Sequence, residues 1–238
     1  MDRNERPEND ILYGLHTVAA ALANPKRKFV KLMATKNAAE RIKDEIAAAG
    51  LTPVETSPRE LDRIVGPEAV HQGMVLEAKP IRQPRLDQIP KEGVTVFLDQ
   101  VTDPHNVGAI LRSCAAFAVT ALVTTARHSP EGSGVLFKAA SGAYELVPFV
   151  KVTNLSRAMD EMREHGFRLI GLDSDGETAI SEVDATPPLA LVLGAEGKGL
   201  RELTRKTCDQ IVRLDLPGAI KSLNVSNAAA ISLYALLR

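Results

Sequence analysis

The chain has 238 residues, of which 45% are hydrophobic and 25% are charged, the composition of an ordinary globular protein. Its 29 Lys and Arg residues nearly balance its 30 Asp and Glu residues, so the net charge does not indicate a nucleic-acid-binding protein, and any such contact must come from a local patch. Two isolated cysteines, Cys114 and Cys208, exclude a zinc cluster and a disulfide framework; we expect small buried hydrophobic side chains and no metal. The start of the chain lacks a signal-peptide pattern and no apolar run is long enough to span a bilayer, so we expect a cytoplasmic protein with no membrane partner.

The first predicted domain, residues 11–78, is a small α/β module that follows a disordered tail at residues 1–10. Its expected elements are a short helix closed by Asn24-Pro25, strand 29–34, helix 38–49, a strand near Pro53, helix 59–65 and strand 73–78. Lys26, Arg27 and Lys28 precede the first of these strands and form a basic cluster, which is either a solvated turn or a site for a negatively charged partner. Residues 79–93 contain three prolines and little apolar periodicity, which predicts a linker.

The remaining residues, 94–238, are predicted to be a doubly wound α/β domain. Continuously apolar strands such as Leu189–Leu193 are typical of parallel strands that are covered on both faces. Strands are expected at 94–98, 121–125, 146–150, 168–172, 189–193 and 210–216, and helices at 107–117, 135–140, 155–165 and 200–207, with a loose loop at 126–134. The final helix, 227–237, has no charged side chain, so its own domain or a second subunit must cover nearly all of it.

Polar side chains follow three of the predicted strands, at the sheet edge where open α/β proteins bind ligands. After the first strand of this domain, Asn106 fits a helix N-cap, and Arg112 either reaches solvent or clamps a phosphate. After strand 189–193, a loop with glycines at 194, 197 and 199 invites the close approach of a ligand and carries Glu196 in its middle. This loop has neither the dinucleotide pattern nor the phosphate-loop pattern.

The third polar cluster lies between the last strand and the last helix and contains Lys221, Ser222, Asn224 and Ser226. Ser222 is a candidate cap for the last helix, with the other side chains bonded to nearby backbone, but this explains only part of the cluster. The three loops together predict one pocket at the carboxyl ends of the strands.

These loops resemble motifs of the SpoU (TrmH-like) family of RNA 2′-O-ribose methyltransferases, within the SPOUT superfamily. The matching segments are DPHNVGAILRSCAAF, LVLGAEGKGL and SLNVSNAAAISL, and YGLHTVAAAL and HQGM match in the first domain. The similarity is greatest to the branch that methylates a guanosine ribose in 23S ribosomal RNA, and transfer RNA is the chief alternative substrate. Departures at Ala118, Asn227 and Ala230 affect helix packing rather than a catalytic group.

The resemblance implies a second domain with a parallel sheet and a deep C-terminal trefoil knot, and a ribosomal-protein-like RNA-binding domain before it. It implies S-adenosylmethionine as methyl donor, RNA as partner, and a homodimer with shared active sites. It assigns catalysis to Arg112, Asn106, Glu196, Ser222 and Asn224, donor binding to Gly194, Glu196, Gly197, Leu214, Leu216, Leu223 and Asn224, and RNA contact to Lys26, Arg27, Lys28, His105 and Arg112.

A guanidinium is effectively always protonated, so we expect Arg112 to grip the RNA phosphate beside the reacting ribose rather than to act as a base. Asn106 and Glu196 are expected to fix Arg112 and the ribose. Two rival interpretations are a dinucleotide-dependent dehydrogenase, which the missing glycine pattern disfavours, and an RNA-binding protein without catalysis, which the intact polar loops disfavour.

Overall fold

A computed structural model describes residues 9–127 and 133–237, and these fall into two compact units. The first unit spans residues 1–82 and 131–145, and the second spans residues 83–130 and 146–238. The segment that ends at residue 145 therefore packs in the first unit, although it lies between two strands of the second unit along the chain. No helix in the described ranges is both long enough and apolar enough to cross a membrane.

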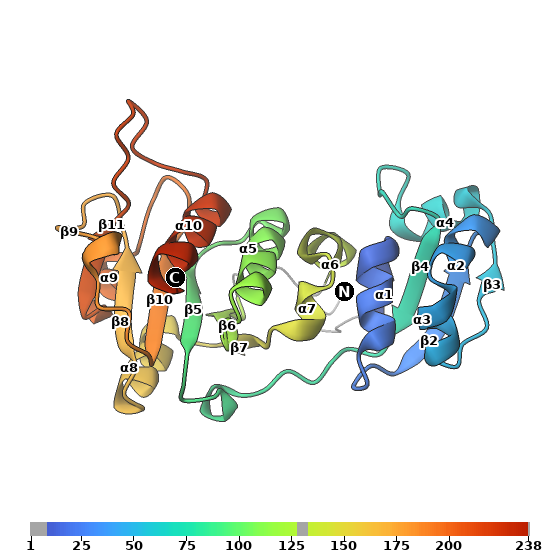
Figure 1. Ribbon diagram of the computed structural model, residues 1–238, viewed down its shortest axis with the longest axis horizontal. Helices are drawn as coiled ribbons and strands as arrows, with labels where there is room; N and C mark the ends of the chain where they lie inside the picture. The colour runs from blue at the N-terminus through green and yellow to red at the C-terminus, as the bar shows by residue number, and fades with distance from the viewer. Residues whose placement is uncertain (1–8, 128–132, 238) are drawn as a thin grey trace, which may run out of the picture. The chain divides into compact units, whose positions relative to one another are not determined.

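The first unit is built on a four-stranded sheet with the order β1-β4-β2-β3 (Figure 1). Strands β1, β4 and β2 pair antiparallel, and β3 pairs parallel to β2. The elements are β1 (Asp10–Tyr13), α1 (Leu15–Ala23), β2 (Phe29–Ala34), α2 (Lys36–Arg41), α3 (Lys43–Ala48), β3 (Val54–Glu55), α4 (Pro58–Val65), β4 (Met74–Ala78), α6 (Gly134–Ala140) and α7 (Ala143–Leu146). Side chains of α1, β2, β4 and α6 share one core, in which Leu32, Leu76 and Phe137 are fully buried.

Two expectations for this unit are wrong. Asp10 begins a strand and is 7% exposed, so the predicted disordered tail extends too far; residues 1–8 lie outside the described residues. The predicted helix 38–49 is two helices, because Ile42 leaves the helical conformation at φ −130° and ψ 35°. Ile42 and Ile46 both lie in the core, where they are 7% and 6% exposed.

The second unit contains a seven-stranded sheet with the order β7-β6-β5-β10-β8-β11-β9. All its strand pairings are parallel, which confirms the predicted α/β class. The strands are β5 (Val94–Asp99), β6 (Ala121–Thr125), β7 (Phe149–Val152), β8 (Arg168–Leu172), β9 (Thr178–Ala179), β10 (Leu189–Gly194) and β11 (Gln210–Arg213). The helices are η1 (Leu86–Gln88), α5 (Pro104–Ala116), α8 (Leu155–Glu164), η2 (Ile180–Glu182), α9 (Glu202–Thr207) and α10 (Val225–Leu237).

Several segments from residue 79 onward differ from the expected elements; the strand expected at 210–216, for example, ends at Arg213. Residues 143–146 are helical, so the strand expected from 146 starts only at Phe149, and Leu146 is 72% exposed. The short strand β9 was not expected. The second half of the predicted linker packs on the second unit, since Leu86 and Ile89 lie in its core. Residues 128–132 of the predicted loop lie outside the described residues.

The two cysteines differ in burial. Cys114, in α5, is fully buried, and burial raises the pKa of its thiol to about 12. Cys208 is partly buried, and burial, with a further contribution from the Asp209 carboxylate, raises the pKa of its thiol to about 12. Neither thiol is ionised at neutral pH, so neither has the thiolate character of a reactive cysteine.

The topology brings the predicted loops to one edge of the sheet. Strands β5, β10, β8 and β11 are consecutive neighbours and run parallel, so their carboxyl ends lie together. The chain leaves β5 into α5, and α10 packs along α5 (Figure 1). The starts of both helices therefore face the same edge as the loops that follow β8, β10 and β11.

Candidate active site

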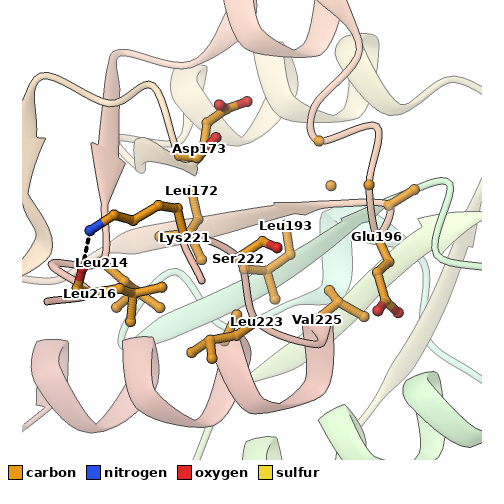
Figure 2. A pocket seen from close by; sticks show the side chains of 16 residues that line it. Leu172, Asp173, Leu193, Glu196, Leu214, Leu216, Lys221, Ser222, Leu223 and Val225 are labelled. Carbon is orange, nitrogen blue, oxygen red and sulfur yellow. Dashed lines mark hydrogen bonds between the residues drawn. The ribbon is translucent and has the colours of Figure 1, made fainter. Parts of the chain in front are cut away.

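A cavity lies at this edge of the second unit (Figure 2). It is lined by the residues after β8, by the glycine loop after β10, by the segment after β11 and by the start of α10. Leucine side chains, including Leu172, Leu214 and Leu223, form much of its wall. In Figure 2, Asp173 and Lys221 lie on one side of the cavity and Glu196 lies on the other. The cavity thus offers an apolar surface with polar groups at both ends.

The glycine loop folds tightly back on itself. The Gly199 N–H donates to the Ala195 carbonyl at 2.9 Å, and an added Cβ at Gly194 would lie 2.2 Å from the Gly199 carbonyl carbon. Gly199 has a φ of +64°, a conformation that favours glycine. The close approach expected from the glycines is therefore made at Gly194 by the loop's own backbone.

A buried carboxylate holds the far end of this loop. Asp99, the last residue of β5, is fully buried. Its Oδ2 accepts the backbone N–H of Arg201 at 3.0 Å, and its Oδ1 accepts the Arg201 Nε–H at 2.6 Å. The pair joins the loop after β10 to the end of β5, so the first two predicted loops are fixed to each other.

Asn224 connects all three predicted loops. Its Nδ2 donates to Oδ1 of Asn106 at 2.9 Å and approaches Oε2 of Glu196 at 3.4 Å. Its Oδ1 accepts the backbone N–H of Ser226 at 3.0 Å and the Ser226 hydroxyl at 2.6 Å. Three of the residues predicted for catalysis therefore meet, although they are far apart in the chain.

The helix caps differ from the sequence predictions. Helix α5 is capped by Asp103, whose side chain accepts the His105 N–H, so Asn106 is free to bond Asn224. Helix α10 starts after Asn224, whose side chain accepts the backbone N–H two residues later, the geometry of an N-cap. Ser222 is not this cap and instead lines the cavity.

Arg112 lies elsewhere on α5. Its side chain is exposed, it does not line the cavity, and within residues 9–127 and 133–237 no hydrogen bond or ion pair holds it. The predicted contacts from Asn106 and Glu196 to Arg112 are therefore not present in the single chain; these two residues contact Asn224 instead. His105, in the first turn of α5, is exposed as well.

Most residues predicted to bind the donor line the cavity. They are Gly194, Glu196, Gly197, Leu214, Leu216 and Leu223, whereas Asn224 lies outside the lining and reaches it through Glu196. Sequence reasoning missed Asp173 as a lining residue and missed the anchoring role of Asp99. Each is an acidic residue that directly follows or ends an apolar strand, and this signal was available. Among the described residues, no group of three His, Cys, Asp or Glu side chains suits a metal ion.

The predicted basic patch needs a correction at Arg27. Its side chain is fully buried in the first unit. Its Nη1 lies 2.6 Å from Asp10 Oδ2 and donates to the Lys79 carbonyl, and its Nε and Nη2 donate to the Glu145 carboxylate at 2.8–3.1 Å. Because every guanidinium nitrogen already has a protein acceptor, Arg27 does not contact an RNA phosphate. Lys26 and Lys28 remain exposed.

The chain matches two family models. One, described as the SpoU rRNA Methylase family, matches residues 93–234, and the other, described as RNA 2′-O ribose methyltransferase substrate binding, matches residues 11–84. The chain is 37% identical to the 23S rRNA (guanosine-2′-O-)-methyltransferase RlmB of Yersinia pestis, over 97% of each chain. It is 36% identical to the protein of the same name from Pseudomonas putida, over 95% of each chain.

A solved structure has a similar fold. The SpoU methyltransferase AviRb from Streptomyces viridochromogenes, in complex with the cofactor AdoMet, matches with a TM-score of 0.82 and 24% identity. The match covers 97% of this chain and 89% of AviRb. At this identity the likeness establishes the fold.

Proposed function

The chain belongs to the SpoU rRNA methylase family, and from this premise we propose that it transfers a methyl group from S-adenosylmethionine to the ribose 2′-hydroxyl of a guanosine in 23S ribosomal RNA. The observation that carries the proposal is the meeting of Asn106, Glu196 and Asn224 beside a leucine-walled cavity. Because the relatives match over nearly their whole length, both the RNA-binding and the catalytic parts have counterparts here.

The cavity suits an adenosine-containing donor. Leu172, Leu214 and Leu216 supply apolar surface for a purine, and the exposed backbone of the glycine loop supplies donors and acceptors without side-chain obstruction. S-adenosylmethionine supplies a methyl group on a positively charged sulfur, which is already activated for transfer. Glu196, at the end of the cavity nearest Asn224, is placed to favour that positive charge.

The remaining task for the protein is to orient the ribose hydroxyl and to allow its proton to leave. We assign the orientation to Arg112, which is exposed and has no protein partner among the described residues. A guanidinium binds phosphate oxygens in a bidentate way, so Arg112 would hold the phosphate next to the reacting nucleotide. His105 and Ser222 would contact the same nucleotide from the start of α5 and from the cavity wall.

The arrangement of the whole chain is part of the proposal. The first unit would bind RNA in the manner of a ribosomal protein, residues 79–85 would link the units, and the second unit would catalyse the transfer. A deep C-terminal knot is supported by the position of β11 between β8 and β9, with the next segment, 214–223, returning to the cavity. Ribosomal RNA is modified where ribosomes assemble, so we place the protein in the cytoplasm.

The proposal is tested by mapping 2′-O-methyl groups in total RNA from cells with and without this chain. We expect one guanosine of 23S rRNA to lose its mark in the deletion strain and to regain it when the wild-type chain is restored. A mark lost from transfer RNA instead would change the substrate. Unchanged methylation of all RNA, together with no binding of S-adenosylmethionine by the purified protein, would refute the function.

A further inference from the structure

Asp173 has no role in the function proposed above, although it lines the cavity. It directly follows β8, and its side chain is only 11% exposed. In Figure 2 it lies on the side of Lys221, away from Glu196 and the reacting end of the site. An acidic side chain so nearly buried needs compensation by its neighbours.

The contacts of Asp173 fix its carboxylate in one orientation. Its Oδ2 pairs with Nη1 of Arg205 at 3.0 Å, and its Oδ1 accepts the backbone N–H of Asp175 at 3.1 Å. The Asp173 N–H donates to the Val212 carbonyl at 2.9 Å, which ties the residue to the neighbouring strand β11. Both oxygens are thus positioned by the protein, and each keeps acceptor capacity for a further hydrogen bond.

The glycine loop leaves space beside this carboxylate. A Cβ added to Gly199 would lie 3.1 Å from Asp173 Oδ2, so the carboxylate lies against bare backbone there. A side chain at position 199 would crowd this end of the cavity. Because Gly199 has no side chain, Asp173 stays accessible to a ligand that lies along the glycine loop.

We propose that Asp173 binds the ribose hydroxyl groups of the donor's adenosine, with Arg205 as the residue that positions it. Arg205 compensates the charge of the carboxylate, and a compensated acceptor suits neutral hydroxyl groups better than the ammonium of the donor's amino-acid part. Leu172 and Leu214 line the same cavity and would contact the purine. A carboxylate that accepts ribose hydroxyls near the end of a parallel strand is a known solution in nucleotide-binding sheets.

This inference rests on the proposed function, because it requires an adenosine-containing donor in the cavity. The first test therefore uses the wild-type protein and calorimetry. It compares S-adenosyl-L-homocysteine with the analogue that lacks both ribose hydroxyls. We expect the analogue to bind about tenfold more weakly or worse, the scale of hydrogen bonds to a charged acceptor. Equal affinity would overturn the inference alone, whereas no binding of either ligand would refute the proposed function as well.

The second test uses Asp173→Asn, and the matched control is Asp175→Asn, at an exposed position two residues later. Asp173→Asn is expected to weaken S-adenosyl-L-homocysteine about tenfold and to leave the affinity for the hydroxyl-free analogue within about twofold of wild type. Its KM for S-adenosylmethionine should rise while kcat changes little, because the hydroxyls do not react. Arg205→Met should also weaken the binding of S-adenosyl-L-homocysteine and not that of the hydroxyl-free analogue, but by a smaller factor than Asp173→Asn.

Two results would contradict the assignment. Equal weakening of both ligands would mean that Asp173 only supports the loop. If Asp173→Asn weakened S-adenosyl-L-homocysteine but not 5′-methylthioadenosine, which keeps the ribose hydroxyls and lacks the amino-acid part, the carboxylate would recognise the ammonium instead. Should Asp173→Asn fail to fold, the wild-type comparison of the two ligands still decides the question.

Discussion

Asn224 carries two functions in one amide group. Its oxygen caps α10, and its nitrogen joins Asn106 to Glu196. Aspartate has almost the same shape and also caps helices well, but it has no donor. A substitution of Asn224 by aspartate would therefore keep the cap and make the contact with Glu196 repulsive.

We predict that Asn224→Asp lowers kcat at least about tenfold, because a second carboxylate would face Glu196 where an N–H donor now lies. The free energy of unfolding should change by less than about 1 kcal/mol, since the cap persists. The matched control is Asn154→Asp, because the Asn154 side chain also caps a helix: its Oδ1 accepts the Arg157 N–H at the start of α8. Unaltered turnover in Asn224→Asp would remove this amide from the catalytic site.

A substitution of Arg112 tests whether this residue binds the RNA phosphate beside the reacting ribose. Arg112→Ala should lose methyl transfer by a factor of about 10² or more while it binds S-adenosyl-L-homocysteine normally, because Arg112 lies outside the cavity lining. Arg157→Ala, which changes another exposed arginine of the second unit, should keep full activity. The assignment is wrong if the purified Arg112→Ala protein methylates RNA at the wild-type rate.

Within the first unit, a buried ion cluster joins α7 to β1 and to the turn before β2. Arg27 is bonded to Asp10 of β1 and to Glu145 of α7, and Asn24 Nδ2 also donates to Glu145 Oε2 at 2.7 Å. Removal of the guanidinium leaves the Asp10 and Glu145 carboxylates buried without the positive charge that Arg27 supplies.

We predict that Arg27→Met destabilises the first unit by about 3–5 kcal/mol, the usual cost of breaking a buried ion pair on one side. Amide hydrogen exchange of β1, β2 and β4 should speed up, because these strands share the core with α6. Lys26→Met, at the exposed neighbouring position, should leave the exchange unchanged. Normal protection in Arg27→Met would show that the cluster contributes no net stability.

Lys26 and Lys28 are the basic residues of this turn that remain available to RNA. If both contact phosphates of single-stranded RNA, the double variant Lys26→Ala/Lys28→Ala should bind RNA more weakly. The slope of the logarithm of its binding constant against the logarithm of the salt concentration should decrease in magnitude by about 1.4, or about 0.7 for each lost phosphate contact. Filter binding at several salt concentrations measures this slope. An unchanged slope would exclude both lysines from the interface.

The sequence patterns predicted which helices and strands exist better than they predicted where each one begins and ends. The span of β2, β6 and β8 agrees with the expected strands residue for residue, because each is an apolar run between clear turn signals. The helix break at Ile42 was not predicted, because no glycine or proline marks it in the sequence. Charge counting placed Arg27 in a basic patch, since the sequence does not reveal that Glu145 lies beside it.

At the scale of the whole molecule, the meeting of the three loops was predictable and the strand order was not. Parallel strands place their carboxyl ends at one edge whatever their order, so Asn106, Glu196 and Asn224 were expected together. The position of β11 between β8 and β9 depends on pairings between distant segments, which hydrophobic periodicity does not encode. The resemblance in the motifs, rather than the pattern, led to the expectation of a knot.

The uncharged helix α10 is covered on one face only within a single chain. Ala229 and Leu233 are fully buried, whereas Ile231 and Tyr234 are 45% and 56% exposed on the other face. The Tyr234 ring meets the ring of Phe117, the residue after α5, edge to face, so the exposed surface continues from α10 to the end of α5. Apolar side chains at this spacing on a helix are typical of an interface, and we propose that a second copy of the chain covers them.

We predict that wild-type protein sediments as a dimer and that Ile231→Asp sediments as a monomer, because a carboxylate in an apolar interface loses its hydration without a partner. The monomer should fold normally, since Ile231 is already exposed in the single chain, and it should lose methyl transfer if the partner completes the site. Val70→Asp, at an apolar position of the first unit that is 66% exposed, is the control and should stay dimeric and active. A monomeric wild type, or a fully dimeric Ile231→Asp, would show that this face of α10 is not the dimer interface.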